Sequence, residues 1–98
     1  MAEPSRHAEW IEEGGEIVLI GGWAHVALSE HFAARIDTSD YQVFLTSYDA
    51  VLVFVQNRGA AGFEIHVAPA SRHKPPSAAR CAYRVVARRI TFDLSAGA

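Results

Sequence analysis

Histidine and cysteine side chains are the first candidates for chemistry in this chain, and their spacing decides whether they can act together. The 98 residues include five histidines and one cysteine. His25 and His31 lie six positions apart, and His66 and His73 are separated by a proline-containing segment. Neither pair has the compact spacing of two histidines on one turn of a helix, which is the usual metal-binding pattern. We therefore expect no metal site and no other cofactor.

A nucleophilic mechanism finds little support either. Ser29, Glu30 and His31 supply the residue types of a hydrolase triad, but adjacent residues cannot converge on one reacting atom. Ser29 is predicted instead to cap a single helical turn. Cys81 has no flanking signature of a catalytic thiol, and a buried apolar position is the usual place for a lone cysteine. Turn aspartates such as Asp37 usually bond to their own backbone. The sequence therefore predicts a protein that is not an enzyme.

Positive charge gathers towards the C-terminal end of the sequence. Arg84 and Arg88 are four residues apart in an alternating segment, so both are expected on one exposed face of a strand. Together with Arg72, Lys74 and Tyr48, they form the predicted surface for a ligand or partner. Such a surface suits phosphate, a sulfated sugar or the acidic residues of a neighbouring chain. The alternative, a solvated face with local ion pairs only, is the more frequent behaviour of surface charge.

The whole chain carries little net charge. Its nine lysines and arginines against eleven acidic residues give a formal charge of −2, which argues against nucleic-acid binding. No apolar run approaches the ~20 residues that a membrane-spanning helix needs. The first residues also lack the apolar core of a signal peptide. We expect a soluble protein that is made in the cytoplasm and does not insert into a membrane.

Alternating apolar residues predict strands, and no predicted helix is long enough to connect two parallel strands in a βαβ unit. The expected strands are 17–20, 23–28, 41–46, 50–56, 63–67 and about 80–92, with turns at Gly14-Gly15 and 37–40 and an exposed loop at 68–79. The prediction is an all-β fold, a small antiparallel β-sandwich or partly open barrel of six or seven short strands. Residues 10–93 would form one domain between flexible segments at 1–9 and 94–98.

Several of these strands carry apolar residues on both faces, whereas a two-layer β domain buries only one face of each strand. The surplus predicts surface that is buried between copies of the chain. We therefore predict a homo-oligomer. The residues of the predicted interface are Ile17, Leu19, Leu52, Phe54, Val86 and Ile90.

A recurring order of residues runs along the expected strands. It comprises Gly22-x-Ala24-x-Val26-x-Leu28, Phe32, Tyr41-x-Val43-x-Leu45-Thr46, Gly62-Phe63-x-Ile65 and Tyr83-x-Val85-x-Ala87-x-Arg89. With this order, residues 16–92 resemble the small β domain at the C-terminal ends of phage tail-fibre and tail-spike proteins and of related bacterial surface or repeat proteins. The resemblance implies a terminal module that caps, trimerises or contacts a surface, and it implies no catalysis.

The sequence departs from that family in two places. Residues 72–79 stand where the family has a glycine-rich segment, and no fibre shaft precedes Gly22. Both an excised fragment and a stand-alone module remain open, as does a place in an extracellular phage-like particle.

Two functions follow as expectations. The first is a non-enzymatic structural module that self-associates, as a trimer by the resemblance, at the end of a phage-like fibre or surface protein. The alternative is a lectin-like module that binds a surface glycan or protein receptor through the loops at 47–49, 57–62 and 72–76.

Overall fold

Six strands pair into one antiparallel sheet in the computed structural model, which describes residues 9–69 and 77–90. The elements are β1 (Trp10–Ile20), β2 (Trp23–Ala27), α1 (Glu30–Ala33), β3 (Ile36–Ser47), β4 (Val53–Gly59), β5 (Gly62–Val67) and β6 (Ala78–Arg89). The strand order is β3-β6-β1-β2-β5-β4, with every pairing antiparallel. The predicted all-β class and partly open barrel are confirmed.

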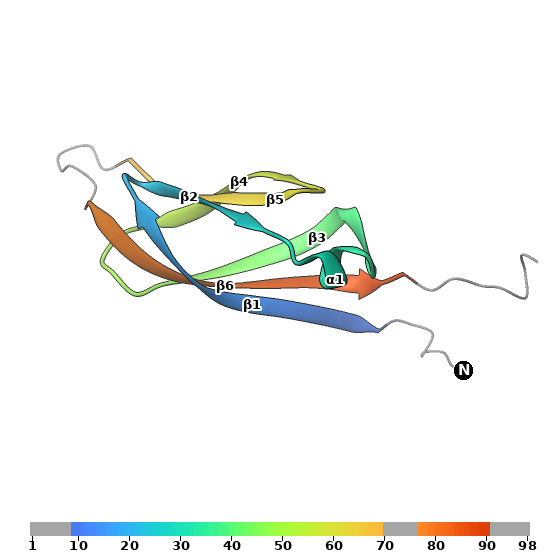
Figure 1. Ribbon diagram of the computed structural model, residues 1–98. Helices are drawn as coiled ribbons and strands as arrows, with labels where there is room; N and C mark the ends of the chain where they lie inside the picture. Colours follow the sequence, from blue (N-terminus) through green and yellow to red (C-terminus); the bar gives the residue numbers. More distant parts are fainter. Residues whose placement is uncertain (1–8, 70–76, 91–98) are drawn as a thin grey trace, which may run out of the picture.

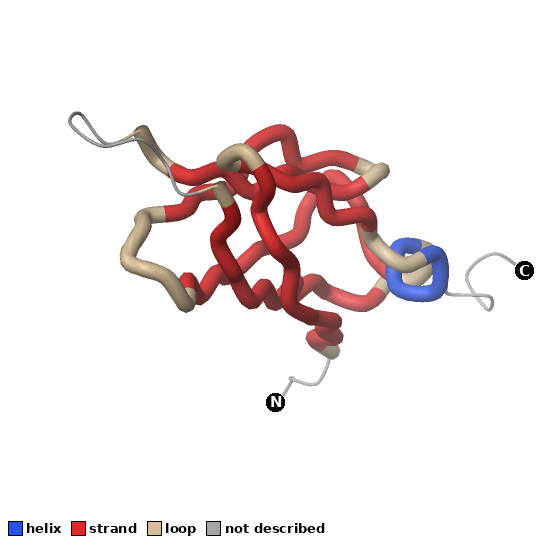
Figure 2. The backbone as a smooth tube through the Cα atoms, turned by 60° about the vertical axis from the view of Figure 1, so that its left-hand side comes forward, coloured by secondary structure: helices blue, strands red, loops and turns tan. Residues whose placement is uncertain are grey.

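The sheet folds back on itself at the hairpin between β1 and β2. Gly21 and Gly22 have positive φ values of 65° and 93°, which glycine adopts without a Cβ clash and which tight hairpin turns favour. Only Ile20 and Trp23 pair across this hairpin. Beyond it, β1 runs along β6 while β2 runs along β5. The half-sheets β3-β6-β1 and β2-β5-β4 therefore face one another, and the strands wrap around a common interior (Figures 1 and 2).

A tyrosine joins the two edge strands, β3 and β4. The Tyr41 hydroxyl lies 2.9 Å from both the Gly59 and Gly62 carbonyl oxygens and accepts a bond from the Gly59 N–H at 3.1 Å. Arg58 donates from its guanidinium to the Tyr41 carbonyl oxygen. The pairing register shifts at this seam in both strands, between Ile36 and Tyr41 and between Gln56 and Gly59. Such irregularities increase local bending and twist, which brings the two edges together.

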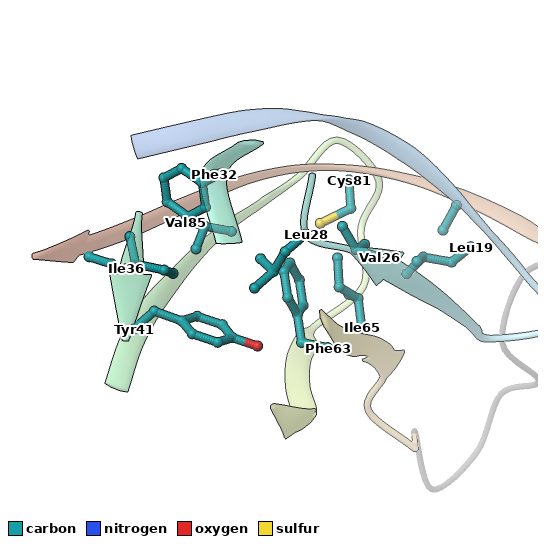
Figure 3. Close-up of a cluster of buried hydrophobic side chains, with 12 residues drawn as sticks. Leu19, Val26, Leu28, Phe32, Ile36, Tyr41, Phe63, Ile65, Cys81 and Val85 are labelled. Carbon is teal, nitrogen blue, oxygen red and sulfur yellow. The ribbon is translucent and has the colours of Figure 1, made fainter. Parts of the chain in front are cut away.

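Inward-facing side chains of the two half-sheets form the core (Figure 3). Among the described residues, the buried hydrophobic side chains are Leu19, Val26, Leu28, Phe32, Ile36, Tyr41, Phe63, Ile65, Ala79, Cys81, Val85 and Ala87. Phe63 is at the centre, 6.4 Å from Tyr41 and 5.9 Å from Tyr83 between ring centroids. Aromatic pairs in these tilted arrangements add to the gain from burial. Phe32 of α1 reaches the same core.

The structure corrects two predicted turns. Gly14-Gly15 lies inside β1 and pairs with Arg84 and Tyr83 of β6, and neither glycine has a positive φ. A Cβ on Gly14 would lie 2.6 Å from the Tyr83 carbonyl oxygen, so close approach of the backbones explains this glycine. Residues 37–40, the second predicted turn, form the irregular stretch within β3.

The predicted chain ends and the long loop are only partly covered. The segments 1–9 and 94–98 lie outside the described residues apart from Glu9, and so do residues 70–76 of the loop. The last strand begins at Ala78 and ends at Arg89, earlier at both ends than the sequence suggested.

Candidate binding surfaces

Three arginines form a strip along the outer face of β6. Arg80, Arg84 and Arg88 alternate with inward residues such as the fully buried Val85, so all three are exposed. Each guanidinium lies over an aromatic ring from β1, from β3 or from the residue that follows β3. The pairs are Arg80 with Tyr48 at 5.6 Å, Arg84 with Phe44 at 5.1 Å and Arg88 with Trp10 at 5.9 Å. This arginine strip places cationic groups at regular intervals on one half-sheet.

The guanidinium groups of the strip differ from the other described arginines in their partners. Arg35 contacts a His31 ring nitrogen at 3.4 Å, Arg58 donates to a carbonyl oxygen, and Arg89 donates to the Glu9 carboxylate at 2.8 Å. Within residues 9–69 and 77–90, no hydrogen bond engages a guanidinium of the strip. The nearest carboxylate contact is between Arg84 and Glu12 at 3.8 Å. Among the described residues their N–H donors therefore have no hydrogen-bond acceptor, and these donors suit an anionic ligand.

Rows of different chemistry lie between these arginines. The pairing register aligns Gln42, Val86 and Glu12 in one row across β3, β6 and β1. It aligns Thr46, Ala82 and Glu16 in the next such row. Because alternate residues share a face, both rows lie on the same outer surface as the arginines. Cationic positions thus alternate with amide, hydroxyl and carboxylate positions along the half-sheet.

An apolar row begins at the end of β1 and continues across the opposite half-sheet; we define it as Ile20, Trp23, His66 and Phe54. The register places these four side by side across β1, β2, β5 and β4. The His66 ring stacks between the other two rings, with centroids 5.9 Å from Trp23 and 5.7 Å from Phe54. Ile20, Trp23 and Phe54 remain 64, 48 and 39% exposed. Val18 and Leu52 extend the exposed apolar surface at its ends.

A hydrogen-bonded carboxylate adjoins the apolar row. Glu64 Oε1 accepts bonds from His66 Nε2 and Asn57 Nδ2, both at 2.9 Å. These bonds, the one from His66 first, lower the pKa of Glu64 below its usual value of 4.5. His25 adds a smaller electrostatic contribution in the same direction. The carboxylate orients His66 and so fixes the middle ring of the row.

A shallow hollow at the seam offers less as a binding site. Its volume is about 230 Å³ and its lining is Thr38, Ser39, Tyr41 and Arg58. The side chains of Ser39, Tyr41 and Arg58 already have hydrogen-bond partners in the fold. Ser39 donates from both its hydroxyl and its N–H to Asp37, which lowers the pKa of that carboxyl. The hollow is part of the closure of the barrel.

The predicted interface residues divide among three environments. Leu52 is the most exposed large apolar side chain among the described residues, at 79%, and Phe54 belongs to the apolar row. Val86 lies half-buried on the outer face, and Ile90 is half-buried just beyond β6.

The predicted face of β1 needs correction. Leu19 is fully buried and is not available to a partner, and Ile17 is partly buried and packs against the core. The exposed apolar residues of this strand are Val18 and Ile20. The run 17–20 is apolar at every position, and alternation alone cannot say which face points inward.

The predicted ligand residues are brought together in part. Arg84 and Arg88 lie on one exposed face, as expected, and Tyr48 lies beneath Arg80 on the same surface. Arg72 and Lys74 lie outside the described residues. The sequence analysis did not place the rings of Phe44 and Trp10 on this surface, because their positions beside β6 follow only from the register of three strands.

Residues considered for catalysis are engaged in the fold. Ser29 caps α1 as predicted, accepting a bond from the Phe32 N–H at 3.1 Å and donating from its hydroxyl to Glu13 at 2.7 Å. Cys81 is fully buried as expected, and this burial raises the pKa of its thiol. In the part of the chain that the structure describes, no three metal-ligating side chains gather.

Comparison with known proteins adds no assignment. A scan against models of protein families found no match, and a search of curated proteins found none either. Among the described residues, no helix has the length and apolar character needed to cross a bilayer.

Proposed function

We propose that this chain is a non-enzymatic assembly module that self-associates through the apolar row. The observation that carries the proposal is the row itself. It lies outside a core that is already filled by the opposite faces of the same strands. Exposed apolar clusters of this kind, bordered by polar residues, mark interaction surfaces in soluble domains.

The composition of the row suits a protein interface. Trp23 and Phe54 are aromatic anchors of the type that dominates binding energy, and Leu52 projects beside them. Fully burying a large apolar side chain is worth ~1.5–3 kcal/mol, so several such residues can offset the cost of association. The hydrogen bond between Glu64 and His66 supplies a polar edge.

We propose that the assembly is a trimer, because the sequence resembles the fibre-end domains of phage tail proteins and this resemblance implies trimerisation. In such an arrangement each copy would bury its apolar row against neighbouring copies and leave the β3-β6-β1 face outward. That face would then be free to contact a surface glycan or receptor, the second function that the arginine strip supports.

The experiment compares Leu52→Glu with Thr46→Glu in sedimentation velocity at micromolar concentration. Both positions are exposed in the single chain, so neither substitution disturbs the core. A buried glutamate should weaken association about tenfold or more at position 52 and leave it unchanged at position 46. Equal association of the two variants and the unmodified chain would contradict an interface at the apolar row.

A further inference from the structure

We propose that the arginine strip binds an acidic polysaccharide in which charged and neutral sugars alternate. The inference rests on the β3-β6-β1 face and is independent of self-association through the apolar row. The ligand class follows from three observations: open guanidinium donors, their spacing, and the chemistry of the rows between them.

The aromatic rings hold the guanidinium groups in position for anion binding. Each guanidinium carbon lies 5.1–5.9 Å from the centroid of an aromatic ring, a distance at which cation–π attraction restrains the group. A guanidinium edge matches the two oxygens of a carboxylate or sulfate and forms paired hydrogen bonds with them. Because the side chain is already ordered by the ring, less rotamer entropy is lost on binding.

The spacing of the arginines in the strip suits a ligand whose negative charges are widely separated. Successive arginines are four residues apart on a strand, which corresponds to roughly 13 Å at the usual strand rise. Glu12 and Glu16 lie in the rows between them. A nucleic-acid strand carries a charge about every 3.4 Å in a duplex, so its phosphates would meet these carboxylates. An alternating polysaccharide places neutral units there instead.

The intervening rows are suited to sugar hydroxyls. Gln42 and Thr46 are exposed on β3 and present an amide and a hydroxyl. Glu12 and Glu16 can accept hydrogen bonds from hydroxyl groups. In contrast, stacking of nucleic-acid bases needs open ring faces, and the guanidinium groups cover one face of each ring. The surface therefore favours the polysaccharide.

Hyaluronan oligosaccharides, in which every second sugar carries a carboxylate, are the probe. Binding to the full chain is measured by calorimetry at low salt, with neutral dextran and oligo-dT as comparison ligands. We expect hyaluronan to bind, dextran not to bind and oligo-dT to bind more weakly. We also expect the affinity for hyaluronan to fall as salt is added, since the contacts are exposed ion pairs.

Substitutions of the arginines in the strip test whether hyaluronan binds there. Arg84→Gln and Arg88→Gln should each weaken hyaluronan binding about fivefold, and the double variant about twentyfold. Arg84→Lys keeps the charge but loses the planar fork, and should also weaken binding. Arg35→Gln removes the same charge near α1 and should leave binding unchanged. Circular dichroism and light scattering on each variant check that fold and mass are preserved.

Several outcomes would overturn the proposal. Absence of hyaluronan binding would do so, as would equal weakening by Arg35→Gln, which would mean attraction by charge without a site. Tighter binding of oligo-dT would reassign the strip to nucleic acid. Because mass is recorded for the same samples, failure of self-association is distinguished from failure of this site.

Discussion

The Tyr41 hydroxyl bridges the two edges of the sheet, and its removal tests how much this closure stabilises the fold. Tyr41 is 2% exposed and its hydroxyl bonds to the backbone of Gly59 and Gly62. Tyr41→Phe leaves these backbone groups without that partner, which should cost about 1–3 kcal/mol of unfolding free energy. Urea unfolding measures the change.

Tyr83→Phe is the matched control. Tyr83 is also an inward-facing ring in contact with Phe63, but no described residue hydrogen-bonds to its hydroxyl. Its substitution should change stability by less than about 0.5 kcal/mol. Equal losses in the two variants would show that the bridge contributes nothing beyond ring packing.

Glu64 makes the stability of the fold depend on pH, and the direction of its lowered pKa fixes the direction of that dependence. Hydrogen bonds from His66 and Asn57 lower its pKa in the folded chain, so its stabilising contribution is present above the usual value of 4.5. The contribution is lost as pH falls through the lowered pKa. The stability difference between the unmodified chain and Glu64→Gln should therefore shrink as pH is lowered from about 7 to about 3. A difference that stays constant over this range would contradict the assignment.

At the scale of elements, Gly62 sets the close approach of β5 to β2. Its φ is 134°, and a Cβ there would lie 2.9 Å from the Ala27 Cα and would clash with the Val26 carbonyl oxygen. Gly62→Ala should cost about 3 kcal/mol or more, because both backbones would have to shift. Thermal or urea unfolding measures the loss.

Gly59 belongs to the same β4–β5 hairpin and offers the control. A Cβ there meets nothing within 4 Å, and its φ is not positive. Gly59→Ala should change stability by about 1 kcal/mol or less. If both alanine variants were equally unstable, the crowding at Gly62 would not be the cause.

The glycine pairs also show what the sequence can and cannot predict at this scale. Alternation along 23–28, 41–46 and 63–67 was enough to predict strands, and the cap at Ser29 followed from residue type. Gly14-Gly15 and Gly21-Gly22 look alike in the sequence, yet only the second pair is a turn. The difference arises from the long pairing of β1 with β6, which is a tertiary interaction. The same pairing decides that Leu19 points inward and Ile20 outward.

The arginine strip and the apolar row show the same limit of prediction from sequence. Arg84 and Arg88 were predicted on one face from their spacing, because strand periodicity is a local property. The rings beneath them come from β1 and β3, so no local pattern reveals those contacts. The apolar row likewise takes one residue from each of four strands.

At the scale of the whole molecule, the two half-sheets share one core and present two unlike outer faces. The β3-β6-β1 face carries the arginine strip, and the other half-sheet carries most of the apolar row. A module of this kind would assemble through one face and contact a ligand through the other. Removing the charge of the strip should therefore leave the assembly intact.

The most direct test of self-association is the absolute mass of the unmodified chain, measured by light scattering coupled to size exclusion at micromolar concentration. The account predicts a stable species of three times the 10.7 kDa chain mass. A species of 10.7 kDa at all concentrations tested would contradict it, leaving the apolar row without a second copy to cover it.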